Sequence, residues 1–291
     1  MTNKSSPIMY VNGLFVSEAE AHISPLDRGF TLADGLFETM VAKGNRVFRI
    51  EEHLRRLSHG AEVLQIQLPP QDEIAGVISE TLRHNKLEFS VVRLTVTRGI
   101  DQGRGLDVAS GLTPSMVVRN SLWSGPIDGL PQSRQLAFSS ICRNNLSPLS
   151  GIKSLSYVDG VVARLEARRA GADDALLCNT NGHLTGATSS NVFIVRSERL
   201  LTPCKDDGIL PGVARLTVLE EAGKLNIRVC EQSLKANQVE EADEVFLTNV
   251  VTGPVPVVSV SGNRVGSGES GPATEKIAEA YWNRVREELT S

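Results

Sequence analysis

Hydrophobic residues recur with two different periods in the first half of the chain. Two short apolar runs, 8–11 and 14–16, flank Asn12-Gly13, a dipeptide that favours a two-residue β-hairpin. A second pair of extended runs, 35–42 and 46–49, flanks another turn. From residue 51 the apolar positions fall three and four apart, which indicates an amphipathic helix. The pattern therefore predicts a small antiparallel sheet, followed by helices over 51–64 and 71–85 and a strand over 90–97.

The second half mixes extended and helical patterns without a regular alternation. Turn-forming residues without periodicity fill 123–134, which we interpret as a linker between a small N-terminal domain, 1–122, and a larger C-terminal domain, 135–291. The fold class is therefore predicted to be α+β. The expected strands are 135–140, 174–178, 191–195, 244–247 and 255–260, and the expected helices are 154–170, 213–223 and 273–288.

One lysine, Lys153, lies just before a predicted helix. The apolar positions Leu155, Val158, Val162 and Leu165 are expected to form the buried stripe of that helix, with charged residues on its solvated side. A lysine at the mouth of such a helix would be partly desolvated, which lowers the pKa of an amine. Such an amine is a nucleophile towards carbonyl groups.

Composition excludes several classes of function. The 291 residues include 30 basic and 34 acidic ones, so the formal net charge is −4 and nothing favours binding to a nucleic acid or an anionic membrane. The four cysteines form no C-x-x-C pair, and no histidine stands at metal-ligand spacing, so we expect reduced, packed thiols and no metal site. The N-terminus lacks the apolar core of a signal peptide, which predicts a cytoplasmic protein.

Three places are suited to binding a phosphate. Arg56 follows His53 by three residues and shares its helix face, so the guanidinium can point inwards. Gly212-Val213 opens a predicted helix with free amides. Thr248-Asn249 ends a predicted strand with a hydroxyl and an amide.

A further arginine, Arg104, lies between two glycines in a loop that follows a strand. Glycines on both sides allow close backbone approach, so Arg104 is predicted to clamp a substrate carboxylate.

Together these segments resemble the class IV, fold-type IV enzymes that use pyridoxal 5′-phosphate. That family includes branched-chain and D-amino-acid aminotransferases and aminodeoxychorismate lyase. The resemblance is carried by 27–30, 35–39, 53–57, 151–155, 189–193, 208–213 and 246–257.

The resemblance implies that Lys153 holds the cofactor covalently and later moves the Cα proton. It also implies a small N-terminal and a larger, cofactor-binding C-terminal α/β domain, and a homodimer that completes each site. Around a small amino substrate it suggests Phe37, Glu38 and Arg104. The implied cofactor contacts are Arg56, Lys153, Thr188, Gly212, Val213, Thr248 and Asn249.

Gly186 departs from the family pattern, which commonly has a glutamate there that pairs with the pyridine nitrogen. Thr185 or Thr188 could offer a neutral hydrogen bond in its place. A lyase tolerates this loss better than a transaminase, so the leading prediction is an enzyme that forms 4-aminobenzoate and pyruvate from 4-amino-4-deoxychorismate. The alternatives are an aminotransferase for D-amino or branched-chain amino acids, and a homologue that binds the cofactor poorly and is not catalytic.

Overall fold

The computed structural model describes residues 6–103, 105–125 and 129–290. The chain forms two compact units. The first contains residues up to 124 together with 152–156 and the C-terminal residues from 288, and the second contains the remainder. Segment 152–156, which includes Lys153, thus groups with the N-terminal part of the chain although about thirty residues separate them in sequence.

An antiparallel sheet is the centre of the first unit. Among the described residues it has six strands in the order β2-β1-β6-β5-β3-β4. The predicted hairpin is confirmed, since Asn12 and Gly13 both adopt positive φ between β1 and β2. The strands are β1 (Ile8–Val11), β2 (Leu14–Ser17), β3 (Gly35–Lys43), β4 (Arg46–Val47), β5 (Phe89–Thr97) and β6 (Ser115–Leu122).

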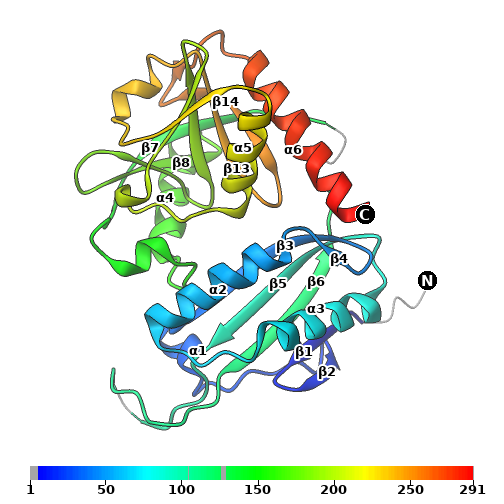
Figure 1. Cartoon of the computed structure of the whole chain (residues 1–291). Coiled ribbons are helices and arrows are strands. Elements are labelled where there is room, and N and C mark those ends of the chain that lie inside the picture. Colours follow the sequence, from blue (N-terminus) through cyan, green and yellow to red (C-terminus); the bar gives the residue numbers. More distant parts are fainter. Residues whose placement is uncertain (1–5, 104, 126–128, 291) are drawn as a thin grey trace. The chain divides into compact units, whose positions relative to one another are not determined.

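Two helices, α2 (Ile50–Leu64) and α3 (Gln71–Asn85), lie across one face of this sheet (Figure 1). Their apolar stripes, including Leu54, Leu57 and Ile78, pack on alternate residues of the strands, such as Met40 and Leu94. Both helices match the predicted periods. A short helix, α1 (Arg28–Leu32), precedes β3 and was not predicted.

The sheet of the second unit has the order β12-β11-β10-β13-β14-β7-β8-β9, with β15 paired to β14. The sequence had not predicted β9, β11, β12 or β15, which have two to four residues each. The strands are β7 (Arg134–Arg143), β8 (Asp174–Asn179), β9 (Leu184–Ala187), β10 (Asn191–Arg196), β11 (Arg199–Thr202), β12 (Arg228–Glu231), β13 (Glu244–Asn249), β14 (Gly253–Val260) and β15 (Asn263–Arg264). The helices are α4 (Val158–Arg169), α5 (Val213–Lys224) and α6 (Pro272–Thr290), and single 3-10 turns cover Pro148–Gly151, Lys205–Asp207 and Ala236–Val239.

Helix α4 differs from its prediction in length and in orientation. It begins at Val158 rather than at residue 154, because the preceding residues are extended. Its buried residues are Ala163 and Ala167, which pack on Ala175 and Leu177 of β8. Small alanines allow the helix to lie close to the sheet, so the valines and leucine of the predicted stripe are exposed instead. The prediction of the buried face was therefore wrong.

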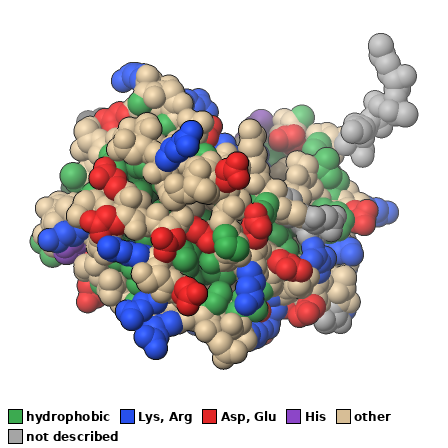
Figure 2. All heavy atoms as spheres, turned by 90° about the horizontal axis from the view of Figure 1, so that it is seen from above, with side chains coloured by type: hydrophobic (Ala, Val, Ile, Leu, Met, Phe, Trp, Pro, Cys, Tyr) green, Lys and Arg blue, Asp and Glu red, His purple; other side chains and the backbone are tan. Residues whose placement is uncertain are grey.

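Surface features agree with the composition. On the face shown in Figure 2, basic and acidic side chains are interspersed. No helix among the described residues is long and apolar enough to cross a membrane. The four cysteines are unbridged, and Cys142 is exposed rather than packed as predicted.

Candidate active site

The backbone of segment 152–156 is bonded to β3, and this places Lys153 on the first unit. The amide of Phe37 donates to the carbonyl of Lys153 at 3.0 Å, and the amide of Leu155 donates to the carbonyl of Gly35 at 2.9 Å. A side chain at Gly35 would prevent this approach, because a Cβ there would lie 2.5 Å from a β5 carbonyl and 2.8 Å from Leu155. Lys153 is therefore held by hydrogen bonds to the strand.

Two cations lie against the Phe37 ring. The half-buried Lys153 has its Nζ 4.3 Å from the ring centroid, and the Cζ of Arg93 is 3.4 Å from the same centroid. The register of β3 and β5 pairs Thr39 with Arg93, which places Arg93 on the sheet face of Phe37, away from α2 and α3. The sequence reasoning missed Arg93. Its signal was a single arginine within the apolar strand 91–96.

On the opposite face of β3, the Glu38 carboxylate is fully buried. Arg56 donates to its two oxygens, from Nε at 2.8 Å and from Nη2 at 2.6 Å. The Nδ1 of His53 lies 2.7 Å from Oε2 of Glu38. His53 and Arg56 thus share a helix face, as predicted, but two of the five N–H donors of Arg56 bind a carboxylate of the protein.

The charges of this cluster determine its protonation. Burial alone would raise the pKa of Glu38, but the nearby Arg56 and then His53 hold that pKa at about 2. Burial lowers the pKa of His53 despite the adjacent Glu38, and Arg56 and Lys153 lower it further. A neutral His53 therefore donates its Nδ1 proton to Glu38, and its buried Nε2 has no hydrogen-bond partner among the described residues. Glu38 thus forms a buried ion pair, and the substrate contact expected from the sequence stays a prediction.

In the second unit, Asn191 connects the other two predicted phosphate-binding segments. Its Nδ2 donates to the carbonyl of Leu210 at 2.9 Å, and a Cβ on Gly212 would lie 2.2 Å from its Oδ1. Across the sheet, Asn191 is the register partner of Thr248. The structure therefore brings Gly212, Val213 and Thr248 together.

This cradle has donors suited to an anion. Gly212 is the N-cap of α5 and provides no side-chain cap, so the first amides of the helix, from Val213 onwards, face outwards along its axis. The hydroxyl of Thr248 is buried and has no hydrogen-bond partner among the described residues. A phosphate group fits this donor set. Asn249 serves the turn instead, because its Oδ1 accepts two backbone amides and its Nδ2 donates to Ser190 at 3.0 Å.

Asp207 fixes the loop that leads to the cradle. Its buried carboxylate accepts hydrogen bonds from Ser233 and Asn179 and contacts Nδ1 of His183 at 3.0 Å. The thiol of Cys204 donates to its other oxygen. These contacts hold the loop five residues before Gly212.

The two threonines beside Gly186, Thr185 and Thr188, both donate their hydroxyl protons to other groups of the protein. Thr185 donates to the carbonyl of Leu177 at 3.2 Å, and Thr188 donates to Oδ1 of Asp174 at 2.7 Å. Gly186 itself has φ +141°, and a Cβ there would lie 2.4 Å from the carbonyl oxygen of Ser190. A glutamate at this position would therefore require the following turn to move.

Arg104 lies outside the described residues. The loop on both sides of it is tied to Arg28, which donates to Asp34, to Asp101 and to the carbonyls of residues 106 and 107. Arg28 belongs to the 27–30 segment that the sequence singled out.

Comparisons with known proteins identify the family of the chain. The family model for class IV aminotransferases matches residues 35–260. A Methanocaldococcus jannaschii protein, provisionally named as a branched-chain-amino-acid aminotransferase, is 34% identical over 94% of each chain. The crystal structure of the Escherichia coli branched-chain amino acid aminotransferase has a TM-score of 0.90 at 26% identity and covers 96% of this chain and 94% of its own.

A Legionella pneumophila structure, provisionally named as a 4-amino-4-deoxychorismate lyase, has a TM-score of 0.83 at 26% identity and covers 92% of this chain and 97% of its own. Solved structures of related aminotransferases contain pyridoxamine 5′-phosphate or a phosphopyridoxyl compound. The cofactor expected from the sequence, pyridoxal 5′-phosphate, is thus confirmed for the family. Because the family model covers residues 35–260 and the mixed α/β fold matches solved structures of type IV, the chain belongs to the class IV aminotransferases.

Proposed function

We propose that the protein is a pyridoxal-5′-phosphate-dependent aminotransferase for branched-chain amino acids. The observation that carries the proposal is the Lys153 amine, fixed on β3 against the Phe37 ring. The relatives support it, because the matched proteins described above include two that are named as branched-chain aminotransferases. They favour this alternative over the lyase that the sequence placed first.

Each unit, taken by itself, has residues that suit one part of the cofactor. The second unit supplies the amides at Gly212 and Val213 and the unpartnered Thr248 hydroxyl for its phosphate. The first unit supplies the Lys153 amine, and Arg56 is proposed as a further phosphate contact, oriented by Glu38. When bound, pyridoxal phosphate supplies an aldehyde that takes up an amino group and a ring that draws electrons from Cα.

Lys153 and the residues around it have separate proposed roles in the reaction. The Lys153 amine removes and returns the proton at Cα of the substrate. The Phe37 ring provides an apolar wall for an aliphatic side chain, and Arg93 beside it is suited to bind the substrate carboxylate. We therefore propose Arg93 for the contact with the substrate carboxylate. The same contact by Arg104, expected from the sequence, stays a prediction.

We also propose a homodimer, supported by the outer face of α4. Val158 is 71% exposed and Val161 57% exposed, and Val162 and Leu165 continue the same apolar surface. Contiguous apolar side chains on one helix face are typical of an interface. Light scattering coupled to size exclusion would test this, and Val158→Glu is expected to shift the protein towards the monomer.

The first experiment is an absorbance spectrum of the protein loaded with pyridoxal phosphate, followed during addition of single D- and L-amino acids without a keto acid. Loss of the visible band with leucine, isoleucine and valine, and conversion of the cofactor to pyridoxamine phosphate, is expected. A band unchanged by every amino acid, together with release of pyruvate from 4-amino-4-deoxychorismate, would establish the lyase instead. Lys153→Ala should show no visible band, whereas the exposed Lys224→Ala should match the wild type.

A further inference from the structure

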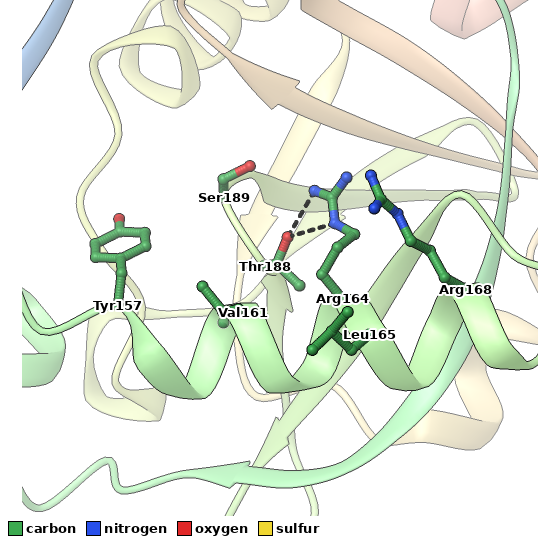
Figure 3. A pocket seen from close by; sticks show the side chains of 8 residues that line it. Tyr157, Val161, Arg164, Leu165, Arg168, Thr188 and Ser189 are labelled. Carbon is green, nitrogen blue, oxygen red and sulfur yellow. Dashed lines mark hydrogen bonds between the residues drawn. The ribbon is translucent and has the colours of Figure 1, made fainter.

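A hollow of about 270 Å³ lies within the second unit, between α4 and the turn from β9 to β10 (Figure 3). The side chains around it include two guanidinium groups and three hydroxyls, and none of the lining residues is a carboxylate. Its lining consists of Tyr157, Gly160, Val161, Arg164, Leu165, Arg168, Thr188 and Ser189.

Arg164 is held rigidly at the base of this hollow. Its Nε and Nη2 donate to the Thr188 hydroxyl at 3.1 and 2.7 Å, its Nη2 also donates to Asp174 at 2.6 Å, and its Nη1 donates to the carbonyl of Asp173. Figure 3 shows the side chain reaching from α4 to Thr188. Asp174 lies behind these groups, with its side chain only 9% exposed and bonded to both. The cluster therefore presents guanidinium nitrogens rather than carboxylate oxygens to the hollow.

The other charged groups near the hollow leave it positively charged. Arg168 is exposed and lines the hollow from the next helical turn. Arg143 of β7 interacts with Tyr157 and Asp159, and burial lowers the pKa of that arginine. The hollow thus has positive charge on the α4 side, and the acidic groups nearby pair with arginines.

The hollow is adjacent along the chain to the phosphate cradle. Thr188 precedes Asn191 by three residues, and three extended residues span at most about 10 Å. Asn191 contacts Gly212 and is paired with Thr248. Pyridoxal phosphate carries its phosphate on a short arm of a pyridine ring, so a phosphate in the cradle leaves the ring within reach of the hollow.

We propose that the pyridine nitrogen of the bound cofactor faces this hollow and remains unprotonated, and that Arg164 keeps it so. The inference rests on the proposed function, because it requires that the protein bind pyridoxal phosphate. A cation beside a base disfavours a second positive charge, and no carboxylate of the lining is present to stabilise one. Thr188 cannot donate to the nitrogen, because its proton is bonded to Asp174. The structure thus assigns a role to Arg164 that follows from its position opposite the turn after Gly186.

The test is the ¹⁵N NMR spectrum of the loaded protein with cofactor labelled at the ring nitrogen. In the wild type we expect the resonance of an unprotonated pyridine across the neutral pH range, with free cofactor as the reference for both forms. A pyridinium resonance would overturn the inference while leaving the aminotransferase proposal intact. Failure to bind the cofactor at all would overturn both.

Variants assign the effect to Arg164. Arg164→Met should raise the pKa of the ring nitrogen by about one unit or more, whereas Arg164→Lys, which keeps the charge, should leave the nitrogen unprotonated. Arg169→Met is the matched control, since Arg169 is exposed on the same helix and does not line the hollow. A ring nitrogen unaffected by Arg164→Met would refute the role of Arg164. Because the wild-type spectrum and Arg164→Lys also test it, the inference remains falsifiable if Arg164→Met does not fold.

Discussion

Replacing Glu38 with glutamine removes a buried negative charge that accepts two hydrogen bonds from Arg56 and one from His53. The pKa of Glu38 falls from 4.5 to about 2 in the folded protein. At about 1.4 kcal/mol per pKa unit, that shift corresponds to about 3 kcal/mol of stabilisation by the ionised form. Breaking a buried ion pair by removing one partner costs about 3–5 kcal/mol, so the two lines of reasoning agree. Glu38→Gln should therefore lower the free energy of unfolding by about 3 kcal/mol at neutral pH.

The pH dependence gives this prediction a second, independent test. Because the folded pKa lies below the ordinary value, the stabilisation is complete above about pH 4.5 and is lost as the pH falls towards 2. The difference between wild type and Glu38→Gln should thus shrink in that interval. Other carboxylates titrate in both proteins and largely cancel in the difference.

Urea unfolding followed by circular dichroism at neutral and acidic pH measures both effects. Glu62→Gln is the matched control, because its side chain is 79% exposed, and it should change stability by less than about 0.5 kcal/mol. A loss below about 1 kcal/mol for Glu38→Gln at neutral pH, or a loss that does not vary with pH, would refute the reasoning from the buried ion pair. If Glu38 instead contacted substrate, its replacement would raise KM for the amino donor and leave unfolding unchanged.

Three further substitutions test other parts of the site. Thr248→Val should raise the Kd for pyridoxal phosphate about tenfold in an absorbance titration, because it removes an unpartnered hydroxyl donor from the cradle. The control Thr252→Val should leave the Kd unchanged. If Thr248→Val and the wild type bind the cofactor with equal affinity, Thr248 is not part of the phosphate site. Gly186→Ala should lower the free energy of unfolding by about 1–3 kcal/mol in thermal unfolding, because Gly186 has φ +141° and its new Cβ would lie 2.4 Å from the carbonyl oxygen of Ser190. The control is Gly223→Ala, whose Cβ would meet no atom within 4 Å, and it should be neutral or stabilising in the same assay. Arg93→Met should lower kcat/KM for branched-chain amino acids by about tenfold or more and leave the affinity for the cofactor unchanged. The control is Arg119→Met, because Arg119 is the exposed register partner of Arg93. An equal decrease in kcat/KM for both variants would argue against a contact between Arg93 and the substrate carboxylate.

Local periodicity predicted most of the longer elements. Helix α3 has the predicted bounds, and the hairpin at Asn12-Gly13 has the predicted turn, because both depend on contacts between residues close in sequence. The short strands β9 and β11 were missed, since four residues carry too little pattern to be distinguished from a loop. The buried face of α4 was predicted wrongly because helical spacing fits the valines as well as the alanines. Which set is buried depends on the neighbouring sheet.

The sequence by itself determined the family and its cofactor, and it singled out Lys153 as the lysine proposed to hold that cofactor, because these depend on the type and order of residues in motifs such as 151–155 and 208–213. Only the tertiary structure decided which groups lie beside them. It paired Arg56 with Glu38, placed Arg93 on Phe37, and put Arg164 rather than a carboxylate at the hollow by Thr188. These contacts join residues 18 to 56 positions apart, and their strength depends on burial and charge, which only the folded arrangement of the strands and helices defines.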